Sequence, residues 1–555
     1  MSNLDYSSLL TRFVLRGSDY QRRVADLLLS GKNVILQAPT GAGKTYAALL
    51  PFIEAQENDL DFPRQCIYSV PMRVLANQFV ASELGLERRA KIQTGEHQDD
   101  AEFRNSLTFA TIDQVLSSFL MTPYGLSRGM ANVNAGAIAS SYLVFDEFHL
   151  YDTKTMLPTT LEMLRILRGV APFVLMTATF SRDMLLALGE YLHATVVPET
   201  DEDALALQAL PSQQKTRRYH VAERPLDAAA VLAAHQRRSL VICNTVERAQ
   251  RLYLQLKADP DCRDEVLLLH ARFLPADRAA IEEHLRAVFD KEAAADARCI
   301  AVATQAIEVG LDITCEALHT ELAPANAVLQ RAGRCARYQG EEGDVYVYPT
   351  SAADPAEIVD LQDKIAPYVS QRDQIVATLA ELQARDGQVF SFLDEQGLIT
   401  AVHGLRDQKT VKALLEAQES HRATMNACWR GEGGSTNELI RSVASQKVII
   451  HDDPLTVAAR PFAYDSFALH IGVVRGLVKR WLERAGETEV SEAAVWGLRE
   501  ITPEEAEHPL WDASLLQSDK DTASALAVIV HPALARYDAQ LGFWPYEGGT
   551  FVAEA

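Results

Sequence analysis

Two series of short apolar runs, separated by longer amphipathic segments, constrain the fold of this 555-residue chain more than any other feature. The runs are rich in β-branched residues, and helix-length stretches follow them, a pattern typical of parallel strands buried on both faces. The first series comprises residues 33–39, 65–71, 106–112, 141–148 and 172–179, and the second comprises residues 238–244, 265–271, 298–305, 315–322 and 343–349. The pattern therefore predicts an α/β fold with two parallel-sheet domains in tandem.

Composition shifts along the chain suggest where its domains end. A stretch near residues 198–225 that contains proline and many charges separates the two series, so we place the first domain at residues 1–205 and the second at residues 206–350. Beyond them, residues 355–384 carry apolar positions at helical spacing, and GEGGS (431–435) is typical of a loop or hinge. We assign residues 351–435 to a helical linker region and residues 436–555 to a C-terminal accessory domain, in which QKVIIH has the character of a strand.

The overall composition is that of a globular protein, with 48% hydrophobic and 23% charged residues. The net charge of −22 argues against a generic basic binder of nucleic acid, so any such contact must come from localised sites. The 7 cysteines include no C-x-x-C pair, which favours reduced thiols over a disulfide framework. No apolar run approaches the roughly 18 residues of a membrane span, and we expect a cytoplasmic protein without membrane contact.

The segment APTGAGKT (residues 38–45) carries the strongest local signal for a bound ligand. It lies between an apolar run and a helical stretch, which is the context of a phosphate-binding loop, although Ala38 replaces the usual first glycine. The glycines let the backbone turn tightly so that successive N–H groups converge on phosphate oxygens. Lys44 would reach the β- and γ-phosphates of ATP, and Thr45 would hold Mg²⁺. The residues that we assign to nucleotide binding here are Thr40, Gly41, Ala42, Gly43, Lys44 and Thr45.

Two adjacent carboxylates follow a later apolar run, in the segment DEFH (146–149). The carboxyl ends of parallel strands are where such sheets bind ligands. We expect Asp146 to hold Mg²⁺ through water and Glu147 to act as the general base toward the attacking water.

The segment QRAGRCAR (330–337) places Arg331, Arg334 and Arg337 at a spacing of three, which predicts one side of a helix. Close cations repel one another unless anions lie nearby, and ATP phosphates would supply those anions. We expect Arg334 and Arg337 to act as arginine fingers in phosphoryl transfer. The alternative interpretation is a solvated basic helix face.

Five motifs in a fixed order over the two α/β domains resemble those of superfamily 2 helicases: the phosphate-binding loop, DEFH, TAT (177–179), VATQAIEVGLDI (302–313) and QRAGRCAR. The resemblance implies two RecA-like domains with ATP between them and a single nucleic-acid strand that moves across both as they close.

The resemblance also implies roles for individual residues. Gln21 would bind the adenine, and Gly310 and Asp312 would lie in the motif that links the strand to the nucleotide. Four residues would couple hydrolysis to domain movement, namely His149, Thr177, Thr179 and Gln330. Four others would contact the backbone of the strand through small polar groups and main-chain amides, namely Arg73, Thr111, Asn244 and Thr304.

Several sequence segments resemble, more specifically, those of the helicase of type I CRISPR interference. They are ATIDQVL, DEFHLYD, LHARFLPADR, VATQAIEVGLDI and, near the end, HPALARYDAQLGF. This resemblance implies an ATP-dependent translocase that a guide-RNA surveillance complex recruits to the displaced, non-target DNA strand. It also implies 3′-to-5′ movement on DNA.

Many members of that family carry a metal-dependent HD nuclease. Residues 1–44 contain no histidine and leave no room for such a domain, and the sole His–Asp dipeptide is His451–Asp452, which we interpret as structural. We therefore expect a helicase without nuclease activity, served by an HD-type nuclease on a separate polypeptide.

Other interpretations of the same motifs remain. The leading alternative is a superfamily 2 helicase of RNA metabolism or DNA repair, in which the region after residue 350 would be a different accessory domain. A protein-translocating motor would need a large insertion in the first domain to grip a polypeptide, and none is seen in the sequence. A scaffold with a decayed ATP site conflicts with the presence of Lys44, Asp146, Glu147 and Arg334.

Overall fold

The computed structural model describes residues 18–71, 90–94, 99–124, 126–294, 296–308, 311–350, 365–432, 436–440, 445–485, 494–501 and 510–546, and the statements below refer to these residues. The chain divides into two compact units. One comprises residues 1–226 and 308–442, and the other comprises residues 227–307 and 443–555.

Seven parallel strands form the first sheet, in the order β3-β4-β2-β5-β6-β1-β7. They are β1 (Asn33–Gln37), β2 (Cys66–Val70), β3 (Lys91–Gln93), β4 (Leu107–Thr111), β5 (Tyr142–Phe145), β6 (Phe173–Thr177) and β7 (Ala194–Val197). The five runs predicted in this part of the chain are confirmed as β1, β2, β4, β5 and β6, each buried along its whole length. The sequence pattern does not predict β3 or β7, because both are short and only partly buried.

Helices cover both faces of this sheet because successive strand residues point to opposite sides. Val34 and Leu36 of β1 pack with Val24 and Leu49 on one face, whereas Ile35 belongs to the apolar cluster on the other face. The first face is covered by α2 (Asp19–Leu29) and α3 (Lys44–Glu57), and the second by α5 (Ile112–Phe119), α7 (Met156–Ile166) and α8 (Arg182–Leu192). The same unit contains α6 (Ala131–Ser140) and α9 (Asp201–Gln208).

A second sheet has the strand order β10-β11-β9-β12-β13-β8. Within each of the groups β10-β11-β9 and β12-β13-β8 the strands are parallel. They are β8 (Thr216–Val221), β9 (Arg238–Ile242), β10 (Glu265–Leu269), β11 (Cys299–Ala303), β12 (Ala317–Glu321) and β13 (Glu342–Tyr348). The five predicted runs of the second series are confirmed as β9 to β13. The strand β8 falls in the stretch that we interpreted as the break, because four of its six residues (TRRYHV) are polar and it lies at the edge of the sheet.

The helices that accompany the second sheet are α10 (Ala228–Ala234), α11 (Val246–Ala258), α12 (Pro275–Phe289) and α13 (Ala325–Ala332). The helical linker region contains α14 (Arg372–Gln383), α15 (Phe392–Glu416), α16 (Gln418–Arg430) and α17 (Thr436–Leu439). Helix α14 confirms the end of the helical pattern predicted for residues 355–384, whose first residues, 355–364, lie outside the described part. Of the predicted hinge, Gly431 ends α16 in a left-handed conformation (φ 77°).

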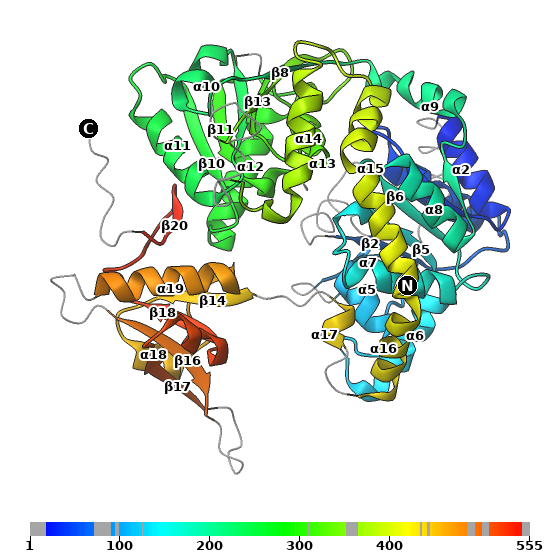
Figure 1. The fold of residues 1–555 in the computed structure, drawn as a ribbon. Coiled ribbons are helices and arrows are strands. Elements are labelled where there is room, and N and C mark those ends of the chain that lie inside the picture. The colour runs from blue at the N-terminus through cyan, green and yellow to red at the C-terminus, as the bar shows by residue number, and fades with distance from the viewer. Residues whose placement is uncertain are drawn as a thin grey trace. The chain divides into compact units, whose positions relative to one another are not determined.

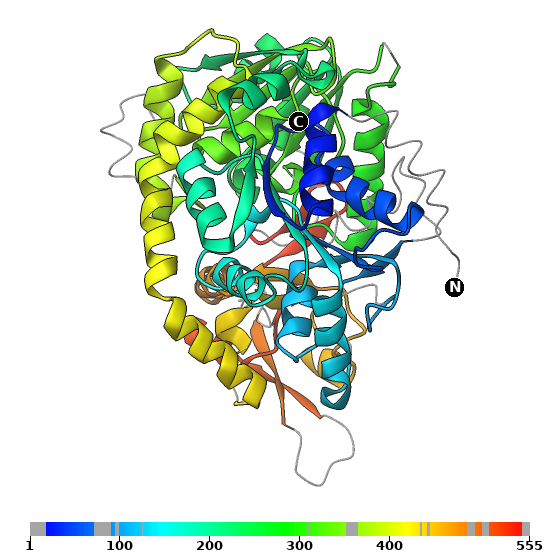
Figure 2. The same cartoon turned by 90° about the vertical axis from the view of Figure 1, so that its right-hand side faces the viewer.

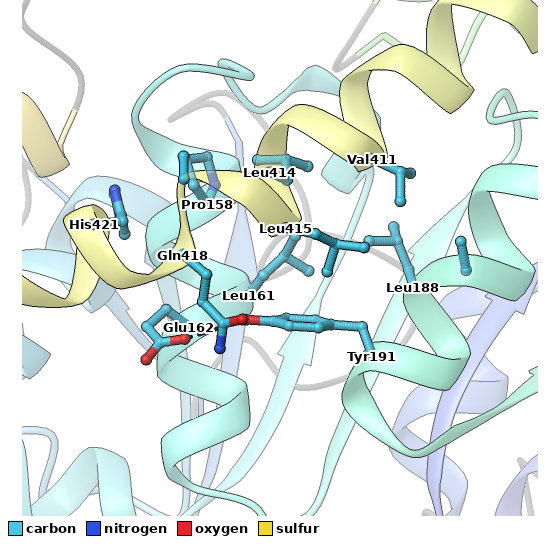
Figure 3. Close-up of a pocket in the computed structure, with 12 residues that line it drawn as sticks. Pro158, Leu161, Glu162, Leu188, Tyr191, Val411, Leu414, Leu415, Gln418 and His421 are labelled. Atoms are coloured by element: carbon cyan, nitrogen blue, oxygen red, sulfur yellow. Dashed lines mark hydrogen bonds between the residues drawn. The ribbon is translucent and has the colours of Figure 1, made fainter.

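The long helix α15 packs against α8, α13 and α14 (Figure 1). Figure 2 shows α15 and α16 continuing one another along one side of this unit. Near the middle of α15, Asp407 accepts a hydrogen bond from the backbone N–H of Ser181, 3.1 Å away, at the start of α8. Further along, Val411, Leu414 and Leu415 line an apolar pocket (Figure 3), which the helices α7, α8 and α16 complete.

The accessory region after residue 443 is built on a mixed sheet in the order β15-β14-β18-β16-β17. Its strands are β14 (Ser445–Ile450), β15 (Phe467–His470), β16 (Val495–Glu500), β17 (Trp511–Leu515) and β18 (Ala527–Val530), and its helices are α18 (Pro454–Ala459) and α19 (Ile471–Ala485). The strand predicted for QKVIIH is confirmed as β14. Helix α19 lies against this sheet (Figure 1), with Trp481 fully buried in the core between them.

The last described segment forms a hairpin of β19 (Arg536–Asp538) and β20 (Gly542–Trp544), which contacts the segments around β10 and α11 in the same unit. His270 donates a hydrogen bond from Nε2 to the carbonyl oxygen of Leu541 (3.0 Å), and Gln250 donates to the same oxygen (2.8 Å). Burial lowers the pKa of His270 to about 3, so its ring is neutral. Gly542 has φ 74°, and a Cβ at this position would lie 2.5 Å from the His270 ring. The hairpin therefore tolerates only glycine at residue 542.

None of the helices in the described ranges is both long enough and apolar enough to cross a lipid bilayer.

The docking of the hairpin predicts the effect of Gly542→Ala. The new Cβ would be strained by the positive φ and would also lie 2.9 Å from the carbonyl oxygen of Arg272, so we expect a loss of about 2–4 kcal/mol in stability. Gly387→Ala is the matched control, because Gly387 has φ 73° but a Cβ there would have none of the described atoms within 4 Å. Limited proteolysis should cleave the C-terminal segment of Gly542→Ala faster than that of Gly387→Ala, and equal cleavage would contradict this docking.

Candidate nucleotide site

The phosphate-binding loop connects β1 to α3. Gly41 and Gly43 both adopt left-handed conformations, with φ of 83° and 87°, as the glycine-rich motif requires. Lys44 is the first residue of α3, and its buried ammonium donates a hydrogen bond to the carbonyl oxygen of Ala38 at 3.3 Å. The loop therefore presents its backbone, the start of a helix and a lysine at one place, an arrangement suited to a phosphate chain.

Gln21 contacts the loop from helix α2. The backbone N–H of Ser18 donates to Oε1 of Gln21 at 2.8 Å, which orients the amide so that Nε2 donates to the carbonyl oxygen of Gly43 at 3.0 Å. Tyr20 supports the same loop, since its hydroxyl donates to the carbonyl oxygen of Ala42 at 2.7 Å. The sequence did not point to Tyr20 as a site residue, although it directly precedes Gln21.

The acidic pair lies where β5 ends. Asp146 accepts a hydrogen bond from the hydroxyl of Tyr68 on the neighbouring strand β2, at 2.9 Å, and another from the backbone N–H of Glu147, also at 2.9 Å. The Tyr68 hydroxyl lies 3.5 Å from Oγ1 of Thr45, so it bridges the two residues predicted to hold Mg²⁺. Burial and the adjacent Glu147 charge raise the pKa of Asp146 to about 7. Nothing in the sequence distinguished Tyr68 from an ordinary core residue of its strand.

Glu147 has a left-handed backbone (φ 47°) and directs its carboxylate toward the phosphate-binding loop. Its Oε1 lies 3.6 Å from Nζ of Lys44, and its Oε2 lies 3.3 Å from Nδ1 of His149. Burial alone would raise the pKa of Glu147, but the nearby charges, that of Lys44 first and that of Arg334 also, lower the pKa below its ordinary value. Glu147 is therefore ionised at neutral pH.

His149 joins three of the predicted motifs. Its Nδ1 lies 3.0 Å from Oγ1 of Thr177, and its Nε2 is hydrogen-bonded to the side-chain amide of Gln330. Burial lowers the pKa of His149 to about 4, so the ring is neutral and can accept from Gln330 while it donates to Thr177. Thr177 also accepts from the backbone N–H of Thr179 at 3.2 Å.

The prediction that three arginines share one side of a helix is wrong. Helix α13 ends at Ala332, so Arg331 is its last arginine and the chain then turns through Gly333 to pair Cys335 with Cys315 in a β-bridge. Arg331 is fully buried, forms an ion pair with Glu308 at 2.7 Å, and donates to Oγ1 of Thr320 at 2.9 Å. It therefore stabilises the second sheet through these contacts.

The turn after α13 lies against the phosphate-binding loop, since a Cβ on Gly333 would lie 3.7 Å from Cγ2 of Thr40. Arg334 donates to the carbonyl oxygen of Glu308 at 2.7 Å, and its charge is close enough to Glu147 to lower the pKa of that carboxyl. Burial and the neighbouring Arg337 lower the pKa of Arg334 to about 9. Arg337 forms an ion pair with Asp312, so it is partly neutralised by a residue that we assigned to the nucleotide site.

The residues predicted to contact nucleic acid fall in both units. Thr111 is buried at the end of β4, where it precedes α5. Asn244 and Thr304 are buried in the other unit, and Gln305 donates from Nε2 to the carbonyl oxygen of Asn244 at 2.9 Å. Arg73 and Gly310 lie outside the described residues.

The His451–Asp452 dipeptide follows β14. His451 accepts from the backbone N–H of Asp453 at 2.9 Å and stacks edge-on against Tyr464. Within the described ranges, no group of three or more His, Cys, Asp or Glu side chains is arranged to hold a metal ion.

Comparison with known proteins agrees with these motifs. Residues 18–186 match the DEAD/DEAH box helicase family, and residues 235–340 match the family described as CRISPR-associated nuclease/helicase Cas3, C-terminal. A putative CRISPR-associated nuclease/helicase Cas3 of Methanocaldococcus jannaschii is 30% identical over 352 residues, which are 56% of this chain and 45% of that protein. The chain is related to the Cas3 helicases.

Solved structures support the same fold. The crystal structure of T. fusca Cas3 with AMPPNP has a TM-score of 0.58 and 19% identity, and the match covers 80% of this chain and 60% of that one. A chain of a CRISPR RNA-guided surveillance complex in a pre-nicking state has a TM-score of 0.55 and 20% identity, over 79% of this chain and 58% of that one. The two parallel sheets are thus RecA-like, as the resemblance predicted. The chain spans between 45% and 60% of the length of these relatives.

The contact between Gln21 and the phosphate-binding loop predicts how removal of this side chain affects nucleotide binding. Gln21→Ala removes the amide that supports the carbonyl of Gly43, which should weaken binding of a fluorescent ATP analogue by about 2- to 12-fold, the equivalent of one neutral hydrogen bond. Gln56→Ala is the control, since its amide also donates to a backbone carbonyl, that of Pro63, but beyond the site. If both variants bind the analogue equally, the assignment of Gln21 fails.

Proposed function

We propose that the chain is an ATP-dependent translocase of single-stranded DNA that unwinds target DNA in CRISPR interference. The observation that carries the proposal is the convergence of Lys44, Glu147 and Arg334 beside one phosphate-binding loop, in a chain related to Cas3 helicases. A loop for phosphates, an ionised carboxylate and a buried arginine together are the groups that phosphoryl transfer needs.

In this proposal each charged group of the site has one task. The loop N–H groups and the Lys44 ammonium bind the phosphates of ATP. Glu147, ionised at neutral pH, accepts a proton from the attacking water. Arg334 stabilises the charge that develops on the transferred phosphoryl group, and its hydrogen bond to the carbonyl of Glu308 holds it in place. Arg337 is the second candidate for this role once it leaves Asp312.

The residues around Asp146 fit a magnesium ion. Asp146 is a buried carboxylate next to a second one, and the hydroxyl of Tyr68 aligns it with Thr45. Hydroxyl and carboxylate oxygens are ligands that Mg²⁺ prefers, and two adjacent carboxylates favour a cation nearby. Thr45 and Asp146 would hold the ion, which supplies positive charge to the phosphates when bound.

Hydrolysis would be coupled to movement through His149. Its neutral ring links Glu147 to Thr177 and to Gln330. A change at the general base, Glu147, would therefore reach both the end of β6 and helix α13. Thr179 extends this link. The nucleic-acid strand would be contacted by Arg73, Thr111, Asn244 and Thr304. Gly310 and Asp312 would lie between this strand and the nucleotide.

The substrate and partners in this proposal follow from the relatives. Their names associate them with CRISPR and, in one case, with an RNA-guided surveillance complex before nicking. We propose that such a complex exposes the non-target strand and that this chain loads on it. A helicase of RNA metabolism or DNA repair is the alternative, and the choice of nucleic acid tests it.

The decisive assay is ATP hydrolysis with single-stranded DNA or RNA, with and without the surveillance complex. DNA should stimulate hydrolysis about tenfold or more, and RNA should not. Lys44→Ala should abolish the activity because it removes the phosphate ligand, whereas Lys32→Ala, at an exposed position, should not. Equal stimulation by RNA would favour the alternative, and hydrolysis by Lys44→Ala would remove the assignment of the loop.

We further propose that an HD-type nuclease is supplied by a separate polypeptide. What supports this is the environment of His451, whose Nδ1 accepts a hydrogen bond from the backbone N–H of Asp453. The purified chain should therefore displace a DNA strand without degrading it when Mg²⁺, Mn²⁺ or Ni²⁺ is added. Degradation of labelled single-stranded DNA that disappears in His451→Ala would contradict the proposal.

A further inference from the structure

Lys215 lies beside the phosphate-binding loop although it follows the loop by many residues in the sequence. It directly precedes β8, and its Nζ donates to the carbonyl oxygen of Arg337 at 3.1 Å and to that of Thr40 at 3.5 Å. A Cβ on Gly41 would lie 3.8 Å from the same Nζ. The ammonium is thus held between the loop and the turn that carries the arginines, and all these residues belong to one compact unit.

Two cations and two carboxylates act on the charge of Lys215. Burial, and then the charge of Arg217 on β8, lower the pKa of Lys215 to about 7; Arg337 lowers it too, whereas Glu395 on α15 and Glu341 raise it. These acids do not neutralise the lysine directly. Glu395 is already paired with Arg217 at 3.1 Å, and both hydrogen bonds of Lys215 go to neutral carbonyls.

A hydrogen bond between the phosphate-binding loop and the segment before β8 does not require the charge of Lys215. Gln213, from the same segment, already donates to the carbonyl oxygen of Thr40 at 3.3 Å. A partly buried ammonium whose two hydrogen bonds go only to carbonyl oxygens, and whose nearby carboxylate Glu395 is paired with an arginine, is unfavourable unless a further anion comes close. The anion that this loop is shaped for is a phosphate chain, and it would lie at Gly41, next to Nζ.

We propose that Lys215 is a second lysine of the nucleotide site, which binds the phosphate groups of a nucleoside triphosphate in addition to Lys44. The inference rests on the proposed ATPase function and names a further residue of the same site. Lys215 also contacts the carbonyl of Arg337. Phosphate binding at this lysine would therefore link nucleotide binding to the turn that carries Arg334 and Arg337.

The test compares Lys215→Met and Lys215→Arg with the wild type in equilibrium binding of AMPPNP. At about pH 7, Lys215→Met should bind about 10- to 100-fold more weakly, the equivalent of a charged hydrogen bond. Lys412→Met is the matched control, since Lys412 is exposed on α15 and its ion pair is with Glu416, one helical turn away.

The pH dependence separates phosphate binding from a structural role. The phosphates raise the pKa of Lys215 in the complex above its value in the free chain, so binding takes up a proton and the wild-type affinity falls as the pH rises from about 7 to about 9. Lys215→Arg stays charged over this range, so it should lose most of this decline. Calorimetry in two buffers of different ionisation enthalpy measures the proton uptake directly.

Binding by Lys215→Met within twofold of the wild type would overturn the inference. So would a Lys215→Arg variant that keeps the wild-type proton uptake, because the titrating group would then lie elsewhere. If Lys44→Ala loses binding while both Lys215 variants behave as wild type, only this inference fails. A wild-type chain that neither binds nor hydrolyses ATP would instead remove the proposed function.

Discussion

The placement of two adjacent carboxylates at the end of β5 is the constraint on which the rest of the site depends. Asp146 is buried and Glu147, which is partly exposed, places a second carboxylate beside it, and such a pair is unfavourable without nearby positive charge. Lys44 and Arg334 supply part of that charge from two different segments. These four groups lie beside the phosphate-binding loop, where the lysine and the arginine suit phosphate groups and the carboxylates suit a cation.

Contacts between distant segments hold this charge pattern in place, and helix α15 makes several of them. Glu395 near its start pairs with Arg217, which in turn donates to the carbonyl oxygen of Cys335 at 2.8 Å. His403 accepts from the backbone N–H of Asn326, 3.4 Å away at the start of α13. Helix α15 is thus linked through Arg217 to the turn that carries Arg334, and it contacts α13 and, through Asp407, the start of α8. These links hold the loop and the arginines in place.

Sequence patterns predicted the parts of the fold and site that are local, and they missed the parts that depend on distant contacts. Buried parallel strands are continuous apolar runs, so β1 and β5 are evident, whereas the polar edge strand β8 is not. The helical spacing of the arginines was misleading because α13 ends at Ala332, directly before Gly333, a residue type that commonly ends helices. Tyr68 and Lys215 reach the site only through the packing of their strands, so no motif could have revealed them.

The central claim is that Arg334 acts on the same triphosphate that Lys44 holds. Single-turnover hydrolysis and AMPPNP binding by Arg334→Ala test it most directly, with Arg64→Ala at an exposed position as the control. We expect Arg334→Ala to hydrolyse ATP about 10³-fold or more slowly while it binds AMPPNP within about tenfold of the wild type, because the guanidinium acts mainly in the transition state. Hydrolysis at the wild-type rate by Arg334→Ala would contradict the claim.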